Sequence, residues 1–263
     1  NKCLYGSTAL ILAADEGHAE CVQLLIDEGA NVNTKTTADQ TALNAATKNG
    51  QFKCVQQLIN AKADVEARNQ EGWAALSLAA ERGDTVCLQL LIDAKADLET
   101  KDSVGYTALN IAAKLGHAAC VRLLLDANAN TEARNNDDWT ALILAAERGD
   151  IECAQLLINA NAALDAKTND WFTALNLAVG FGHIACVRLL LDANASIDSR
   201  TNSGWNILES AAHNGFVDIV KMILAAKADV EATAEDGWTA VMFAANAGHS
   251  TCVTELINAK TRK

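Results

Sequence analysis

Apolar and polar residues alternate along the chain with the spacing of short amphipathic helices separated by polar turns. Within residues 118–127, the apolar side chains of Cys120, Val121, Leu123 and Leu124 recur at helical intervals. Such spacing places them on one face, so this segment is predicted to be a helix with one buried side.

A shorter helix is predicted before this one, from Thr107 to Gly116. Glycine has no Cβ and can adopt the left-handed conformation that closes a helix. Residues 128–139 are rich in Asn and Asp, which is typical of a turn or short hairpin. Neither helix can bury its apolar face alone, so each pair must stack on its neighbours.

This arrangement recurs every 33 residues without insertion or deletion. The tripeptide Thr-Ala-Leu begins at Thr8, Thr41, Thr107, Thr140 and Thr173, and variants of it occupy the intervening and later positions. Eight repeats therefore account for the chain, and they are numbered here in order as 3–35, 36–68, 69–101, 102–134, 135–167, 168–200, 201–233 and 234–263.

The period, the Thr before a helix that ends in Gly-His, the Val-x-Leu-Leu-Leu helix and the polar turn together resemble the ankyrin repeat family. The resemblance implies an all-α solenoid of stacked helix-turn-helix units, joined by short β-hairpin-like turns, in one domain of residues 1–263. The chain departs from the family in having no proline, and Asn44, Asn110 and Asn176 stand where the family has His.

The net charge and the hydropathy of the chain argue against nucleic acid and membrane as partners. A net charge of −12 repels phosphate backbones, so nucleic acid is not expected as a partner. No apolar run approaches the roughly 20 residues that a membrane-spanning helix needs. We expect a soluble monomer that binds neither nucleic acid nor membrane.

Cysteines and histidines are the candidates for chemistry. Seven of the eight cysteines share one repeat position, and Ile219 occupies that position in the remaining repeat, which indicates an apolar core site. His18, His117, His183 and His249 share one position in repeats that are two or three apart, so they do not converge as zinc ligands would. We therefore expect no catalytic residue, metal or cofactor, and a protein that is not an enzyme.

So many unpaired thiols indicate a reducing compartment, cytoplasmic or nuclear. Secretion followed by entry into another cell remains an alternative. Glu255 replaces an apolar residue in the last repeat, as a polar C-terminal cap does. Charged residues two apart near the repeat ends, such as Glu66 with Arg68 and Glu99 with Lys101, could form exposed ion pairs.

One stripe of aromatic residues stands out. The residue before the Thr position is aromatic in six consecutive repeats: Trp73, Tyr106, Trp139, Phe172, Trp205 and Trp238. By the resemblance, this position lies on the turn that projects toward the concave face, where partners bind. Aromatic side chains dominate binding hot spots, but neighbouring rings can also brace the turns, and the two roles are compatible.

Repeat 6 adds further apolar side chains, because Trp171 replaces a turn glycine and Phe181 lies opposite Leu115 of repeat 4. Repeats 4 to 7 are therefore the expected centre of binding, with Arg82, Lys114 and Arg148 as charges that tune it. The predicted function is a protein–protein interaction module: an adaptor, scaffold or stoichiometric inhibitor. The alternatives are a targeting or regulatory segment of a larger enzyme or receptor, and a secreted effector that binds host proteins.

Overall fold

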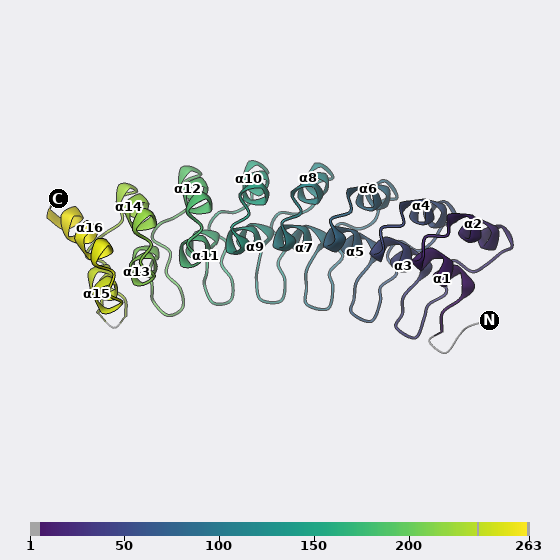
Figure 1. Ribbon diagram of the computed structural model, residues 1–263, viewed down its shortest axis with the longest axis horizontal. Coiled ribbons are helices and arrows are strands. Elements are labelled where there is room, and N and C mark those ends of the chain that lie inside the picture. Colours follow the sequence, from purple (N-terminus) through teal and green to yellow (C-terminus); the bar gives the residue numbers. More distant parts are fainter. Residues whose placement is uncertain (1–5, 236, 262–263) are drawn as a thin grey trace. The chain divides into compact units, whose positions relative to one another are not determined.

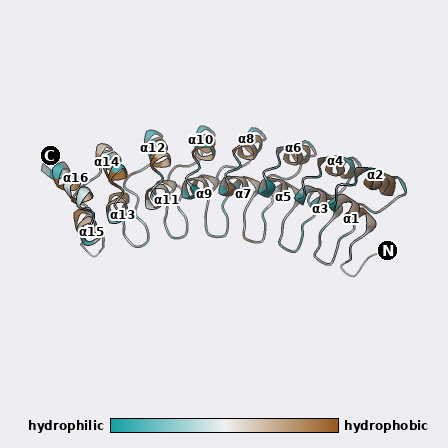
Figure 2. Ribbon diagram, in the orientation of Figure 1, coloured by the Kyte–Doolittle hydropathy of each residue, from teal (hydrophilic) through white to brown (hydrophobic). Residues whose placement is uncertain are grey.

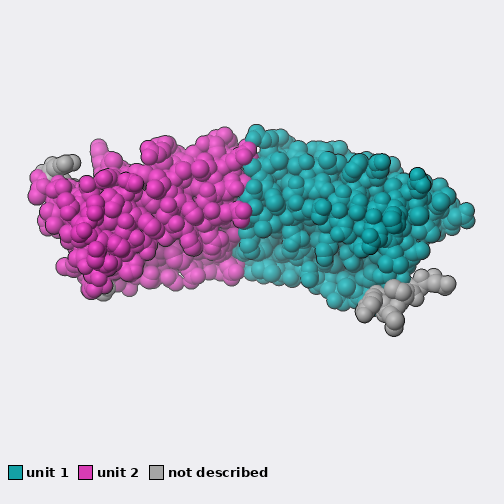
Figure 3. All heavy atoms as spheres, viewed as in Figure 1, with its two compact units in different colours: residues 1–136 teal, residues 137–263 magenta. Residues whose placement is uncertain are grey.

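The computed structural model describes residues 6–235 and 237–261, which form two compact units, residues 1–136 and 137–263 (Figure 3). The first residues of repeat 1, with Cys3, and the last two of repeat 8 lie outside the described residues. Whether the chain acts as the single domain expected from its sequence stays a prediction.

Sixteen helices lie in the described residues, two in each repeat. We name the first helix of a repeat the inner helix and the second the outer helix. Unit 1 contains α1 (Ala9–Asp15), α2 (Ala19–Asp27), α3 (Ala42–Lys48), α4 (Phe52–Asn60), α5 (Ala75–Arg82), α6 (Thr85–Asp93), α7 (Ala108–Leu115) and α8 (Ala118–Asp126). Unit 2 contains α9 (Ala141–Arg148), α10 (Ile151–Asn159), α11 (Ala174–Gly180), α12 (Ile184–Asp192), α13 (Ile207–His213), α14 (Val217–Ala225), α15 (Ala240–Asn246) and α16 (Ser250–Thr261).

Within each unit, inner helices pack on inner helices and outer helices on outer helices, in chain order (Figure 1). The turns project from the row of inner helices. Several outer helices carry both hydrophobic and hydrophilic residues along their length, as amphipathic helices do (Figure 2). The all-α fold of stacked helical pairs predicted from the sequence is thereby confirmed.

The core of each unit lies between its inner and outer rows. On α8, Cys120, Val121 and Leu124 are completely buried, whereas Leu123 of the same predicted face is only half-buried. The Leu124 position is fully buried in repeats of both units, at Leu58, Leu91, Leu124, Leu157, Leu190, Ile223 and Leu256. One repeat position thus supplies the same apolar contact between successive helical pairs.

Side-chain caps are present at the start of most inner helices, and α7 shows the arrangement. The Thr107 hydroxyl accepts a hydrogen bond from the Asn110 backbone N–H, and the Asn110 side chain accepts one from the Thr107 N–H, which makes a capping box. At the other end Gly116 adopts the left-handed conformation, with φ of 76°. Both ends of α7 therefore agree with the prediction.

Asparagines at the family's histidine position bond to the polar segment that follows the outer helix of the same repeat, and Asn44 also reaches the next repeat. The Asn44 Nδ2 donates to the carbonyl oxygens of Ala67, at 3.2 Å, and Trp73, at 3.3 Å. Asn110 Nδ2 likewise donates to the Ala133 oxygen at 3.2 Å. Since these amides are buried, each one satisfies carbonyl groups that water cannot reach.

Replacing Asn110 with alanine should lower the free energy of unfolding by about 1–3 kcal/mol, because the Ala133 carbonyl and the Thr107 N–H lose a buried partner. The matched control is Ser77→Ala at the same repeat position, where the serine side chain is buried but makes no hydrogen bond to a described residue. Urea unfolding of the two variants measures the difference, and equal losses would contradict the bridging role.

Candidate functional site

The projecting turns hold the aromatic stripe by its backbone. In repeat 3 the Asn69 N–H donates to the Trp73 oxygen at 3.1 Å, while the Asn69 side chain accepts from the Trp73 N–H at 2.9 Å. Asp102 forms the same two bonds with Tyr106, at 3.0 and 2.8 Å. Both main-chain groups of each aromatic residue are therefore fixed, and the turn sets the direction of its side chain.

Successive turns are also joined to one another by backbone hydrogen bonds. Each bond runs from an N–H of one turn to a carbonyl oxygen of the turn before it: Gln70 to Ala38, Ser103 to Glu71 and Asn136 to Val104 in unit 1, and Asn169 to Asp137 and Asn202 to Asp170 in unit 2. In the described residues the one isolated β-bridge joins Thr233 and Thr239. The turns thus form a hydrogen-bonded row rather than regular hairpin strands.

In unit 1 the stripe residues Trp73 and Tyr106 are half-buried, and neither ring contacts another aromatic ring of the described residues. The Lys114 Nζ lies 4.7 Å from the centre of the Tyr106 ring. An ammonium group over a ring face is a favourable cation–π contact. Lys114, predicted to tune binding by its charge, is therefore placed against one of the predicted anchors.

In unit 2 the last two stripe residues share an aromatic partner that the sequence analysis missed. The Phe243 ring lies 4.4 Å from the Trp205 ring and 5.2 Å from the Trp238 ring, centre to centre. The His213 imidazole meets Trp205 edge-on at 5.2 Å. The only signal in the sequence is that Phe243 stands where Leu144 and other aliphatic residues stand elsewhere.

The free energy of unfolding can distinguish a stripe residue that braces its neighbours from one that does not. Trp205→Ala removes a ring packed against Phe243 and His213, whereas Trp73→Ala removes a ring without an aromatic neighbour. We expect Trp205→Ala to lower the free energy of unfolding by about 0.5–1.5 kcal/mol more than Trp73→Ala, which is the usual value of such ring contacts. Chemical denaturation monitored by circular dichroism tests this, and a larger loss for Trp73→Ala would contradict it.

Repeat 6 carries the most exposed aromatic side chains of unit 2. Trp171 is 55% exposed and has φ of 64°, in the left-handed region that bulky residues rarely adopt. Most other repeats have glycine at this turn position. The Lys167 Nζ lies 5.1 Å from the centre of the Trp171 ring. A strained, exposed tryptophan is unusual unless function requires it there.

Phe181 ends α11 and is 57% exposed, with its ring stacked on His183 at 6.0 Å. Its equivalent Leu115 in unit 1 is half-buried. Phe172, Phe181 and Trp205 are brought together around one cavity of about 300 Å³ between α11 and α13. Trp171 does not line this cavity.

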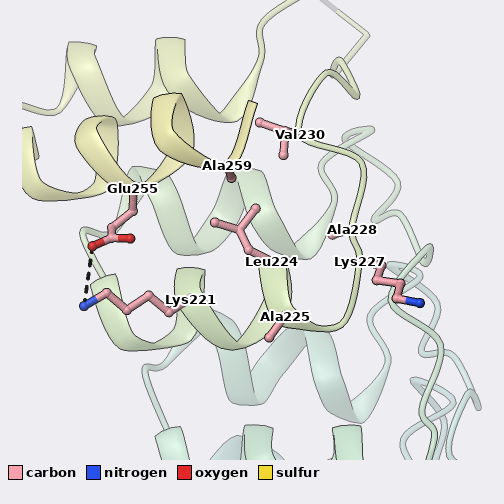
Figure 4. A pocket seen from close by; sticks show the side chains of 8 residues that line it. All are labelled: Lys221, Leu224, Ala225, Lys227, Ala228, Val230, Glu255 and Ala259. Carbon is pink, nitrogen blue, oxygen red and sulfur yellow. Dashed lines mark ion pairs between the residues drawn. The ribbon is translucent and has the colours of Figure 1, made fainter. Parts of the chain in front are cut away.

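A second hollow of unit 2, about 700 Å³, lies between the outer helices α14 and α16 (Figure 4). Leu224 points toward Ala259, and the Lys221 Nζ lies 3.6 Å from a Glu255 carboxylate oxygen at one end. Glu255, predicted to be a polar cap, is therefore one half of a partly exposed ion pair. Such pairs contribute little stability.

The predicted charges lie at the ends of inner helices. Arg82 and Arg148 occupy the last turns of α5 and α9, and Lys114 that of α7; all three are exposed. Basic residues there interact favourably with the helix dipole. Their position is therefore also explained by helix stability.

In repeats 2 and 3, charged residues considered from the sequence as exposed ion pairs bond to the backbone of the next repeat instead. The Glu66 carboxylate accepts from the backbone N–H of Asp97 at 2.8 Å, and Arg68 donates to the Lys101 carbonyl at 3.1 Å. Glu99 in turn accepts from the Asn130 N–H at 2.8 Å. These side chains hold neighbouring repeats of unit 1 together.

The cysteines on the outer helices are core residues, with Cys21 as the exposed exception among those described. Burial raises the pKa of the Cys120 and Cys186 thiols to about 11. Burial, and next a hydrogen bond with Asp84, raises the pKa of Cys87 to about 12. A buried neutral thiol is a poor nucleophile and metal ligand, in line with the structural role inferred for this position.

These pKa shifts predict lower stability at alkaline pH. Thiols of the unfolded chain ionise near pH 9.0, whereas folded Cys120 and Cys186 stay protonated up to about pH 11. The unfolded state therefore loses protons first, and the free energy of unfolding falls as pH rises between these values, at most about 1.4 kcal/mol per pH unit for each thiol. Cys120→Val should reduce this slope, and Ile219→Val, at the same buried position of a repeat without a thiol there, should not. Equal slopes in urea unfolding at pH 9 to 11 would contradict the assignment.

Two of the histidines that precede the outer helices contact backbone carbonyl groups. The His117 Nε2 lies 3.0 Å from the Glu81 carbonyl oxygen, and the His183 Nε2 lies 2.9 Å from that of Glu147. In the part of the chain that the structure describes, no three His, Cys, Asp or Glu side chains are grouped so that they could hold a metal ion. Nor does any helix there combine the length and hydropathy of a membrane span.

Stacked helical pairs of constant length, with hydrogen-bonded turns projecting from one row, define a helical repeat protein. The family model described as Ankyrin repeats (3 copies) matches residues 1–69, 43–135, 76–170, 127–201, 160–234 and 208–263. The chain therefore belongs to the ankyrin repeat family, as its sequence pattern indicated. No curated protein matches the chain as a relative.

Ankyrin repeat domains are generally protein–protein interaction modules, and the matched segments are ankyrin repeats throughout. No enzyme domain is identified in the chain.

Proposed function

We propose that this chain binds a protein partner through its projecting turns and inner helices, as an adaptor, scaffold or stoichiometric inhibitor without catalysis of its own. In unit 2 the centre of this surface consists of Trp171, Phe172, Phe181 and Trp205. In unit 1 Trp73 and Tyr106 serve as anchors, with Lys114 beside them.

Trp171 carries the proposal. Its left-handed backbone favours glycine, so the side chain adds strain to the turn and leaves its ring in water. Large aromatic side chains are the commonest anchors in protein interfaces because they bury much area at low entropic cost. Phe181 presents a second exposed ring from the same repeat.

A single substitution separates binding from folding here. Trp171→Gly restores the residue found in most other repeats at this turn, and we expect thermal stability to stay the same or rise because the left-handed strain is relieved. Partner affinity should fall about tenfold or more, as for a hot-spot residue. The control is Ile151→Ala, which removes an exposed apolar side chain from outer helix α10.

The experiment is a pull-down with mass spectrometry, followed by titration of the recovered partner against each variant. Loss of the partner with Trp171→Gly but not with Ile151→Ala supports the proposal. Equal affinity of wild type and Trp171→Gly, or weakening by Ile151→Ala alone, would move the interface away from the turns.

A further inference from the structure

The cavity between α11 and α13 exists because two side chains are missing from the repeat pattern. Position 180 is glycine, whereas the other repeats place a polar or charged residue there, such as Lys114 or His213. Position 210 is serine, whereas the equivalent residues are apolar, Leu177 and Phe243 among them. A Cβ added to Gly180 would meet nothing closer than the Ser210 hydroxyl at 4.0 Å.

The next repeat pair shows what fills the same space when the side chains are present. There the Phe243 ring packs between Trp205 and Trp238, with His213 at its edge. At the equivalent positions 33 residues earlier, Ser210 replaces Phe243 and Gly180 replaces His213. Phe172 and Trp205 at this cavity therefore correspond to Trp205 and Trp238 around Phe243, but position 210 supplies no ring between them.

Two asparagines that line this cavity have side-chain N–H groups that donate to no described residue. Asn176 and Asn206 both line it and are 6% and 8% exposed. Their Oδ1 atoms accept hydrogen bonds at the starts of α11 and α13, but their Nδ2 groups donate to no described residue. Asn110, at the Asn176 position of repeat 4, uses its Nδ2 on a backbone carbonyl. Because both residues line the cavity, an acceptor atom of a ligand bound there can pair with these donors.

Charge excludes ionic ligands from this cavity. No residue that lines it is charged, and its unused amide groups are donors, which repel an ammonium or guanidinium. A carboxylate would lose its water without gaining a cation, in a chain with a net charge of −12. An uncharged aromatic side chain next to a carbonyl oxygen meets both requirements.

We infer that this cavity binds an uncharged aromatic side chain of a partner polypeptide, stacked between Phe172 and Trp205, with a backbone carbonyl beside it accepting from Asn176 or Asn206. The inference rests on the proposed function, since it names the chemistry that unit 2 recognises. The incoming ring takes the place that Phe243 occupies one repeat later.

The direct test uses N-acetyl-phenylalaninamide as the probe, with the corresponding lysine and glutamate amides as charged controls. In ¹H–¹⁵N spectra of the whole chain, the phenylalanine probe should shift the side-chain amides of Asn176 and Asn206 and the indole N–H of Trp205. The Asn110 amide serves as the internal control and should not move. Absence of these shifts, or equal shifts from the charged probes, overturns the inference.

Ser210→Phe fills the cavity from within, as Phe243 does in the next repeat, and should abolish the probe shifts without lowering the melting temperature. Ser250→Phe, on the exposed start of α16, is the matched control and should leave the shifts unchanged. Should Ser210→Phe overpack, Asn176→Asp keeps the Oδ1 acceptor of the capping box and replaces the unused donor with an acceptor. It should likewise abolish the shifts, and probe binding that survives both substitutions contradicts the assignment.

The partner measurement distinguishes the two proposals. Ser210→Phe should weaken the partner recovered with wild-type protein by about tenfold or more, as expected for an anchor residue that can no longer enter. If Ser210→Phe binds that partner normally while Trp171→Gly does not, the cavity inference is wrong and the proposed function stands. If neither variant affects the partner, both proposals are wrong.

Discussion

Each helical pair of this chain is too small to bury its own apolar side chains, and the rest of the structure follows from that constraint. The outer helices have nine residues in most repeats, so a single pair offers one face and no second layer. Burial of Leu124 and its equivalents is possible only against a neighbouring pair. The constant repeat length, the hydrogen-bonded row of turns and the Asn44 bond to the Trp73 carbonyl all keep successive pairs in the same register.

The sequence was sufficient to predict the fold because its signals are local and repeated. The apolar spacing around Cys120, the Thr107 cap of α7 and the Gly116 that closes α7 each depend on residues a few positions apart. What Asn44 and Asn110 do was not predictable in this way. The carbonyl groups that accept these bonds, those of Ala67 and Ala133, lie 23 residues further along the chain, beyond the outer helix of the same repeat. Only the packed structure brings donor and acceptor together.

The candidate site was predictable in part for a similar reason. The aromatic stripe and the exposed Trp171 and Phe181 are residues that can be read directly from the repeat alignment within the chain. The Phe243 contacts depend on how one inner helix lies against the turn of the preceding repeat, which residue spacing does not specify. The cavity was not predicted because it results from the small size of Gly180 and Ser210. A search of the sequence for apolar or reactive residues does not select small ones.

The regular placement of the buried cysteines has a consequence for the dynamics of the chain. A buried thiol reacts with a modifying reagent only when its own helical pair opens, so its rate of modification measures the free energy of that local opening. Cys54, Cys87 and Cys120 lie at one repeat position in unit 1, and Cys153, Cys186 and Cys252 lie at the same position in unit 2. The protein therefore carries a built-in series of probes, one in each of six repeats, from which a profile of local stability along each unit can be measured without adding a label.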